Sequence, residues 1–161
     1  MLLASTKVLG TPFVPTTPVG GVETVSGILI QADRTTPTVV PVRINMHFEP
    51  GRTYRIPLLE NLGPANTIFH IPIARGPAGQ LLSCPYHVYF QTTHQNRPNL
   101  CAPALAQGSP KYEWFGDIVV LKFDGKRKER YKDVSLKDDL TNVIWFFMNQ
   151  TIPSQERQLH T

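Results

Sequence analysis

Two cysteines and two histidines lie close together in the pattern Cys84-x2-His87-x6-His94-x6-Cys101. Zinc takes four tetrahedral thiolate and imidazole ligands, and a short spacing within the first ligand pair is usual in structural sites. The pattern therefore predicts a zinc site, although the second pair, with six intervening residues, matches no common zinc finger. The alternative interpretation is two unrelated buried thiols and two surface imidazoles, because free cysteine is among the most buried residue types.

The same segment leaves two other kinds of chemistry open. A turn that brings Cys84 against His87 would generate a thiolate nucleophile. No signature of a cysteine enzyme surrounds Cys84, however. A disulfide between Cys84 and Cys101 is permitted by the sixteen residues between them but is not required.

A basic run between residues 126 and 132 has five positive charges against the single negative charge of Glu129. Such a run attracts phosphates or an acidic protein surface, and a tyrosine within it could stack on a base. The residues of this candidate nucleic-acid or acidic-partner site are Lys126, Arg127, Lys128, Arg130, Tyr131 and Lys132. The alternative is a solvated connector whose field is diluted by the flanking acids Asp124 and Asp133. A net charge of +4 permits a nucleic-acid partner without requiring one.

Motifs of the common enzyme classes are missing from the sequence. It contains no G-x-S-x-G elbow, no glycine-rich phosphate loop and no H-E-x-x-H pair. The adjacent carboxylates Asp138 and Asp139 are explained by helix capping, since adjacent helix positions do not face one pocket. An enzyme is therefore less favoured than a binding protein, although catalytic residues contributed by distant loops would leave no such motif.

A C-terminal amphipathic helix is predicted to begin at Ser135, which forms a variant of the capping box with Asp138. Apolar residues then recur at helical spacing, at Leu136, Leu140, Val143, Ile144, Phe147 and Met148. Pro153 is expected to end this helix and residues 154–161 to form a polar tail.

Trp145 and Phe146 lie off the centre of that apolar face. A helix that is apolar almost all round must be covered on two sides, either by the sheet or by another subunit. Trp145 and Phe146 are therefore the candidate residues for self-association.

Prolines are concentrated in the first part of the chain, with fourteen of the fifteen before residue 111. Proline lacks a backbone donor and fixes φ, so long helices are excluded there and short strands with proline-rich loops are expected. The strands predicted from alternation and from β-branched runs are residues 25–31, 38–48, 67–73, 81–91 and 116–123.

These elements predict a mainly β (α+β) fold, an antiparallel sheet or small open barrel with one C-terminal helix. The length of 161 residues suits a single domain, in which residues 1–20 form an extended N-terminal arm. The expected core residues are Ile28, Ile30, Val42, Ile44, Met46, Phe69, Ile71, Val88, Phe90, Ile118, Val120, Leu140, Ile144 and Phe147.

The cellular setting follows from what the sequence lacks. The first residues do not form a signal peptide, and no apolar run approaches the length of a membrane span. We therefore expect an intracellular protein without a membrane partner, in the cytoplasm or the nucleus.

The segment around residues 114–133 carries a resemblance to a group of proteins. Trp114-x-Gly116-Asp117 followed by a buried strand, and then Tyr131-x-Asp133 and an acidic helix start, resembles a pattern in small uncharacterised proteins of mushroom-forming fungi. That group has no established activity, so the resemblance implies a eukaryotic intracellular setting and no site residue.

Three function classes remain from the sequence. The first is a non-catalytic interaction or structural protein that binds a protein partner or self-associates through the helix and the N-terminal arm. The second is a nucleic-acid-associated protein that uses the basic residues 126–132. The third is a metal-binding protein or enzyme centred on Cys84, His87, His94 and Cys101, with zinc as its cofactor.

Overall fold

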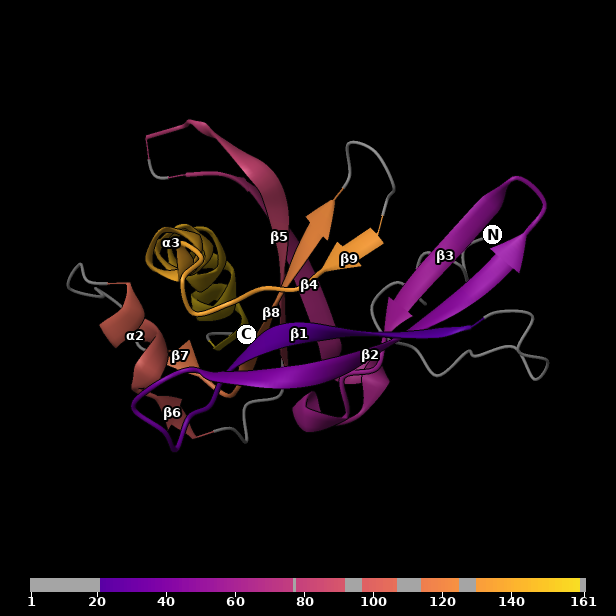
Figure 1. Ribbon diagram of the computed structural model, residues 1–161. Coiled ribbons are helices and arrows are strands. Elements are labelled where there is room, and N and C mark those ends of the chain that lie inside the picture. The colour runs from indigo at the N-terminus through magenta and orange to yellow at the C-terminus, as the bar shows by residue number, and fades with distance from the viewer. Residues whose placement is uncertain (1–20, 77, 92–96, 107–113, 125–129, 160–161) are drawn as a thin grey trace.

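The computed structural model describes residues 21–76, 78–91, 97–106, 114–124 and 130–159 (Figure 1). Within these ranges, the side chains of residues 61, 65 and 150–159 are not described. The expected extended arm, residues 1–20, lies outside the described residues.

Strands dominate the chain, as predicted. The strands are β1 (Val22–Ile30), β2 (Thr38–Glu49), β3 (Arg52–Pro57), β4 (Ile68–Arg75), β5 (Leu81–Gln91), β6 (Pro98–Asn99), β7 (Trp114–Phe115), β8 (Ile118–Asp124) and β9 (Arg130–Lys132). The helices are α2 (Cys101–Leu105) and α3 (Leu140–Leu159), with short 3-10 turns at Glu60–Leu62 and Ala65–Thr67. The fold class is therefore mainly β with a C-terminal helix, and α2 is an additional helix that the proline at its centre concealed in the sequence.

Seven strands form one antiparallel sheet with the order β3-β2-β1-β8-β5-β4, in which β9 also pairs with β8. The sheet curls into a half-barrel. Figure 1 shows α2 and α3 together on one side of the sheet, while the hairpin of β2 and β3 extends away from them. Strands β6 and β7 form a separate small sheet.

The two faces of the sheet bury two different hydrophobic clusters. The helix-side cluster joins β1, β5 and β8 to α2 and α3, with Phe90, Trp114 and Phe147 in mutual ring contact. The inner cluster lies within the curl and contains Val42, Tyr89 and other residues of β1, β2, β4, β5, β8 and β9. Because both faces are covered, the central strand β8 is buried from Ile118 to Leu121.

Most of the expected core residues are buried, and three are less buried than expected. Met46 and Ile71 are partly buried, and Phe69 is 42% exposed. Phe69 lies on β4, the last strand of the sheet, where it stacks on Phe90 at the margin of the helix-side cluster. A residue on an edge strand meets neighbours from one side only, which alternation along the strand cannot reveal.

The start of α3 differs from the prediction. The helix begins at Leu140 instead of after Ser135, and Leu136 is 55% exposed. The Asp138 carboxylate accepts hydrogen bonds from the Tyr86 hydroxyl (2.8 Å), the Lys122 ammonium (2.8 Å) and the Ser135 N–H (2.8 Å). These contacts hold the predicted capping residues against the sheet as a separate turn.

Asp139 caps α3 in place of Ser135, since its carboxylate accepts from the Asn142 N–H at 3.3 Å. The helix continues to Leu159, so Pro153 does not end it as predicted and residues 154–159 belong to its last turns. Within the described part of the chain, no helix is long and apolar enough to cross a membrane.

Candidate functional site

The sheet splits beside β8. Strand β1 pairs with β8 only through Ile28–Ile30, opposite Ile118–Val120. Further along β8, strand β9 takes the same side and pairs with Lys122–Asp124. The first half of β1 therefore diverges from β9, because both strands compete for one edge of β8.

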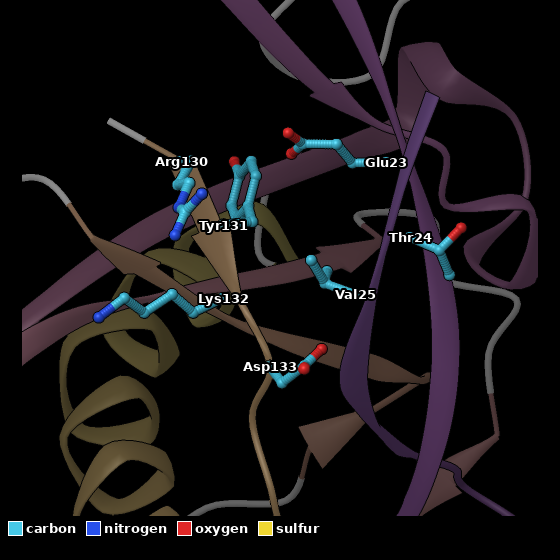
Figure 2. A pocket seen from close by; sticks show the side chains of 7 residues that line it. All are labelled: Glu23, Thr24, Val25, Arg130, Tyr131, Lys132 and Asp133. Carbon is cyan, nitrogen blue, oxygen red and sulfur yellow. The ribbon is translucent and has the colours of Figure 1, made fainter. Parts of the chain in front are cut away.

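A groove of about 540 Å³ lies in this split (Figure 2). Its lining residues are Glu23, Thr24 and Val25 from β1, and Arg130, Tyr131, Lys132 and Asp133 from β9 and the residue after it. We call this hollow the β1/β9 groove. In Figure 2 the Tyr131 ring lies between the Glu23 carboxylate and the Arg130 side chain.

The base of the groove is closed by contacts between distant parts of the chain. The Ser26 N–H donates to Asp133 Oδ1 at 2.7 Å, and the Val134 N–H donates to the Ser26 carbonyl at 3.0 Å. Both main-chain groups of Ser26 therefore point away from β2 and toward β9. These bonds mark the level at which the two walls meet.

The main-chain direction of the walls follows from this contact. The peptide groups of a strand alternate in direction with a period of two residues, so those of Thr24 and Ile28 point the same way as those of Ser26. Ile28 thus bonds to Val120, and along β8 the residues Lys122 and Asp124 bond to β9 in the same manner. The intervening residue of β9, Tyr131, must then present its N–H and C=O away from β8, on the groove side of β9.

The charged side chains of the groove differ in whether they have an ion-pair or hydrogen-bond partner. Glu23 pairs with Arg55 at 3.7 Å, and Lys132 pairs with Asp124 at 3.1 Å. Asp133 is occupied by the Ser26 N–H. Within the described residues, the Arg130 guanidinium has no ion pair. Within the same residues Asp133 also has no ion pair, so the groove contains one positive and one negative charge without an oppositely charged partner.

A cluster of aromatic and imidazole rings lies beneath Tyr131, on the inner face of the sheet. The Tyr131 hydroxyl is 2.5 Å from the Tyr89 hydroxyl and 3.3 Å from His87 Nδ1. The His87 ring stacks on Phe123 with centroids 4.8 Å apart, and His70 stacks on Tyr89 at 5.1 Å. These contacts connect the side chains into one network, which restricts the position of the Tyr131 side chain.

Burial keeps this cluster uncharged near neutral pH. It lowers the pKa of His87 to about 4, with a further contribution from the adjacent His70. It also lowers the pKa of His70, raises the pKa of Tyr131 to about 12 and raises that of Tyr89 well above its usual value. The cluster is a neutral support for the groove, because each group keeps the protonation state that desolvation favours.

The predicted zinc ligands are not brought together. Cys84 and His87 are three residues apart on β5, so their side chains leave opposite faces of the strand. His87 lies in the ring cluster on the inner face, while Cys101 is buried with α2 in the helix-side cluster. His94 lies outside the described residues. Cys84 and Cys101 are both free, and no group of three or more metal-binding side chains occurs within the described ranges.

The structure describes three of the six residues of the predicted basic site. Lys126, Arg127 and Lys128 lie outside the description, while Arg130, Tyr131 and Lys132 all line the β1/β9 groove. Tyr131 is only 6% exposed, and its ring is covered by Phe123 and His87. Its aromatic face is therefore taken up within the protein and not free to stack on a base.

The predicted self-association residues are already in contact with the core. Trp145 and Phe146 are partly buried and pack against the helix-side cluster. The chain itself thus provides part of the cover that this region of α3 requires. Self-association through Trp145 and Phe146 stays a prediction.

The groove also contains residues that sequence reasoning did not find. Glu23, Thr24 and Val25 are far from β9 in the sequence, and no local pattern indicates that the strands converge. His87 and Tyr89 carried a usable signal, since they alternate with the apolar residues of β5 and so mark a second covered face.

The comparisons with known proteins identify no relative. No family model matches the chain, no curated protein matches it, and no solved structure matches it.

Proposed function

We propose that this chain is a non-catalytic interaction protein that binds a protein partner in the β1/β9 groove. The observation that carries the proposal is the split in the sheet, which leaves two strand edges and the Arg130 guanidinium without partners among the described residues. A protein generally satisfies such groups internally or uses them for recognition, because open strand edges pair readily with other chains. On the sequence argument alone, we expect the partner to be intracellular.

The geometry supports the two alternative functions less well. Of the six residues predicted to bind a nucleic acid, the structure describes three, and among these Lys132 is paired with Asp124 and the ring of Tyr131 is covered. A zinc site or a thiol nucleophile needs Cys84 and His87 on one side of β5, and strand geometry separates them.

Site-specific photocrosslinking tests the proposal. A photoreactive benzoylphenylalanine replaces Thr24, which is exposed at the groove, and in a matched control replaces Thr36, which is exposed in the turn after β1. We expect Thr24 to crosslink one partner in native extract and Thr36 not to do so. Mass spectrometry identifies the partner, which is then purified.

Binding of the purified partner provides the decisive measurement. Arg130→Glu should weaken binding about tenfold or more, while Arg34→Glu, a charge reversal at an exposed residue outside the groove, should leave it unchanged. Equal crosslinking at both positions, or equal binding by both charge-reversed variants, would contradict the proposed function.

A further inference from the structure

We infer that the β1/β9 groove opens and closes: in the closed form the first half of β1 pairs directly with β9 as a parallel strand and excludes the partner. This inference rests on the proposed function, because it concerns the regulation of the same site. It follows from the width of the groove, from the directions of the main chains and side chains of its walls, and from the residue at which β1 leaves β8.

The groove has no room for a further strand but is not closed. Residues of β1 and β9 approach each other within 8 Å between Cα atoms, yet the two strands are not paired. Neighbouring strands of a sheet lie about 4.8 Å apart, so an inserted strand would need roughly 9.5 Å between the walls. A movement of about 3 Å brings β1 and β9 to pairing distance instead.

The main chains of the walls are oriented for such a pair. Strands β1 and β9 are both antiparallel to β8, so they run parallel to each other. The N–H and C=O of Thr24 point away from β2, and those of Tyr131 point away from β8, so both open edges lie on the groove side. In the closed form the Tyr131 N–H donates to a carbonyl of β1, which satisfies a main-chain group that the open groove leaves to water.

The side chains of the two strands are compatible with direct pairing. Val25 and Tyr131 both belong to the inner cluster. Thr24 lies on the opposite face, because it precedes Val25 along β1. Arg130 and Lys132 lie on that face too, because they flank Tyr131 along β9. Closure therefore keeps each side chain on the face that it already occupies, and it places the uncharged Thr24 beside two cations (Figure 2).

Gly27 lies at the bend that closure requires. The second half of β1 is fixed to β8 through Ile28–Ile30, and Gly27 comes directly before it. A Cβ atom at Gly27 would lie 2.9 Å from side-chain atoms of both Leu121 and Val42, so a side chain there would displace its neighbours. Glycine also adopts a wider range of backbone angles than other residues, which suits a change of strand direction. Strand β2 stays paired with the first half of β1 and moves with it.

Amide hydrogen exchange of the full chain, followed by NMR, tests the closure. The Tyr131 N–H has its β1 acceptor only in the closed form, so its exchange rate reports the closed population. Thr24→Glu places a carboxylate beside the two cations of β9 and favours closure, whereas Thr24→Arg adds a like charge and opposes it. Relative to the unaltered protein, we expect Tyr131 exchange to be about threefold slower in Thr24→Glu and about threefold faster in Thr24→Arg.

Matched controls separate closure from a general effect of charge. Thr36→Glu and Thr36→Arg change an exposed residue in the turn after β1 and should leave Tyr131 exchange unchanged. Sodium chloride at about 1 M should reduce the difference between the two Thr24 variants, because it screens exposed charges. The Lys132 amide pairs with β8 in both forms, so its exchange should be the same in all variants.

A disulfide that locks the closed form tests whether closure regulates partner binding. Thr24→Cys is combined with either Arg130→Cys or Lys132→Cys, in a Cys84→Ala background that removes the partly exposed native thiol. Direct pairing brings one of these two pairs within the roughly 7 Å between Cα atoms that a disulfide needs. The oxidised protein should bind the purified partner at least about tenfold more weakly than the same protein after reduction.

Three results would overturn the inference. Tyr131 exchange as fast as that of an unfolded peptide, even in Thr24→Glu, would show that the groove does not close. Equal exchange in Thr24→Glu and Thr24→Arg would exclude pairing beside the cations of β9. Equal partner binding by the oxidised and reduced proteins would show that closure does not exclude the partner.

Failure of this inference is distinguishable from failure of the proposed function. If Thr24 crosslinks a partner while the Tyr131 amide stays unprotected, only this inference fails and the proposed function stands. If Tyr131 exchange responds as expected but Thr24 crosslinks no partner, the proposed function fails and the regulatory part of the inference fails with it.

Discussion

The hydrogen bond between Tyr89 and Tyr131 supports the wall of the groove. Removing the Tyr131 hydroxyl should destabilise the protein more than removing the Tyr89 hydroxyl. The Tyr131 hydroxyl contacts both the Tyr89 hydroxyl, at 2.5 Å, and His87 Nδ1, at 3.3 Å. The Tyr89 hydroxyl has Tyr131 as its hydrogen-bond partner, and Tyr89 is 1% exposed. Deleting the Tyr131 hydroxyl thus leaves a buried polar group alone, whereas deleting that of Tyr89 does not.

The magnitudes follow from the cost of an unsatisfied buried group. Tyr131→Phe should lower the free energy of unfolding by roughly 2–3 kcal/mol, because the Tyr89 hydroxyl then has neither water nor a partner. Tyr89→Phe should lower it by about 1 kcal/mol, since the Tyr131 hydroxyl keeps His87. The double variant should cost no more than Tyr131→Phe alone, which corresponds to a coupling of about 1 kcal/mol.

Urea unfolding at pH 7, followed by far-ultraviolet circular dichroism, measures these differences. Tyr54→Phe serves as the control, because the contacts of Tyr54 with His47 and Arg52 involve its ring and survive the change. It should stay within about 0.5 kcal/mol of the unaltered protein. A loss for Tyr89→Phe that equals or exceeds that for Tyr131→Phe, or additive effects in the double variant, would refute the reasoning.

Three further predictions concern stability and metal. Asn99→Ala should lower the free energy of unfolding, measured in urea, by roughly 3–5 kcal/mol, because the buried Asn99 amide bonds to three main-chain groups. The control Asn66→Ala, at an exposed residue, should change it little. Equal effects of the two substitutions would contradict this prediction. His87 stays neutral in the fold, so its stabilising contribution is complete above pH 6.5 and is lost as the pH falls toward 4, by about 3 kcal/mol. His87→Phe should flatten this acid dependence in urea titrations, and an unchanged slope would refute the assignment. A chelator should not change the melting temperature, since β5 separates Cys84 from His87, and a clear drop would show a metal site.

Alternation along single strands predicted much of the fold correctly. The expected strands 38–48 and 81–91 correspond to β2 and β5 within a residue or two. A strand with one covered face must place apolar residues at every second position, and that constraint acts within a few neighbouring residues. Short strands such as β9 escape this reasoning, because three residues are too few to show a period.

The zinc hypothesis failed for a related reason. A spacing of two residues between Cys84 and His87 suits a ligand pair on a turn, but the same spacing on a strand separates the side chains. Pro85 between them favoured the turn, yet the structure continues β5 through it. Spacing predicts a site only when the local backbone conformation is also known.

The capping prediction shows how tertiary contacts override a local pattern. Ser135 and Asp138 do bond to each other as the sequence pattern indicates. Asp138 is also bound by Tyr86 and Lys122, which are 52 and 16 residues away. Those contacts are charge-assisted and hold Asp138 at the sheet, so the helix starts with Asp139 as its cap instead.

The sequence by itself determined the strand content, the amphipathic helix and the positive charge of Arg130 and Lys132, because each depends on residue type and short-range spacing. Only the tertiary structure decided that β9 displaces the first half of β1 from β8 and so creates the groove. Ser26 and Asp133, which close its base, are 107 residues apart. Which strand pairs with this edge of β8 depends on the competition between whole strands. The outcome of that competition cannot be predicted from any short stretch of sequence.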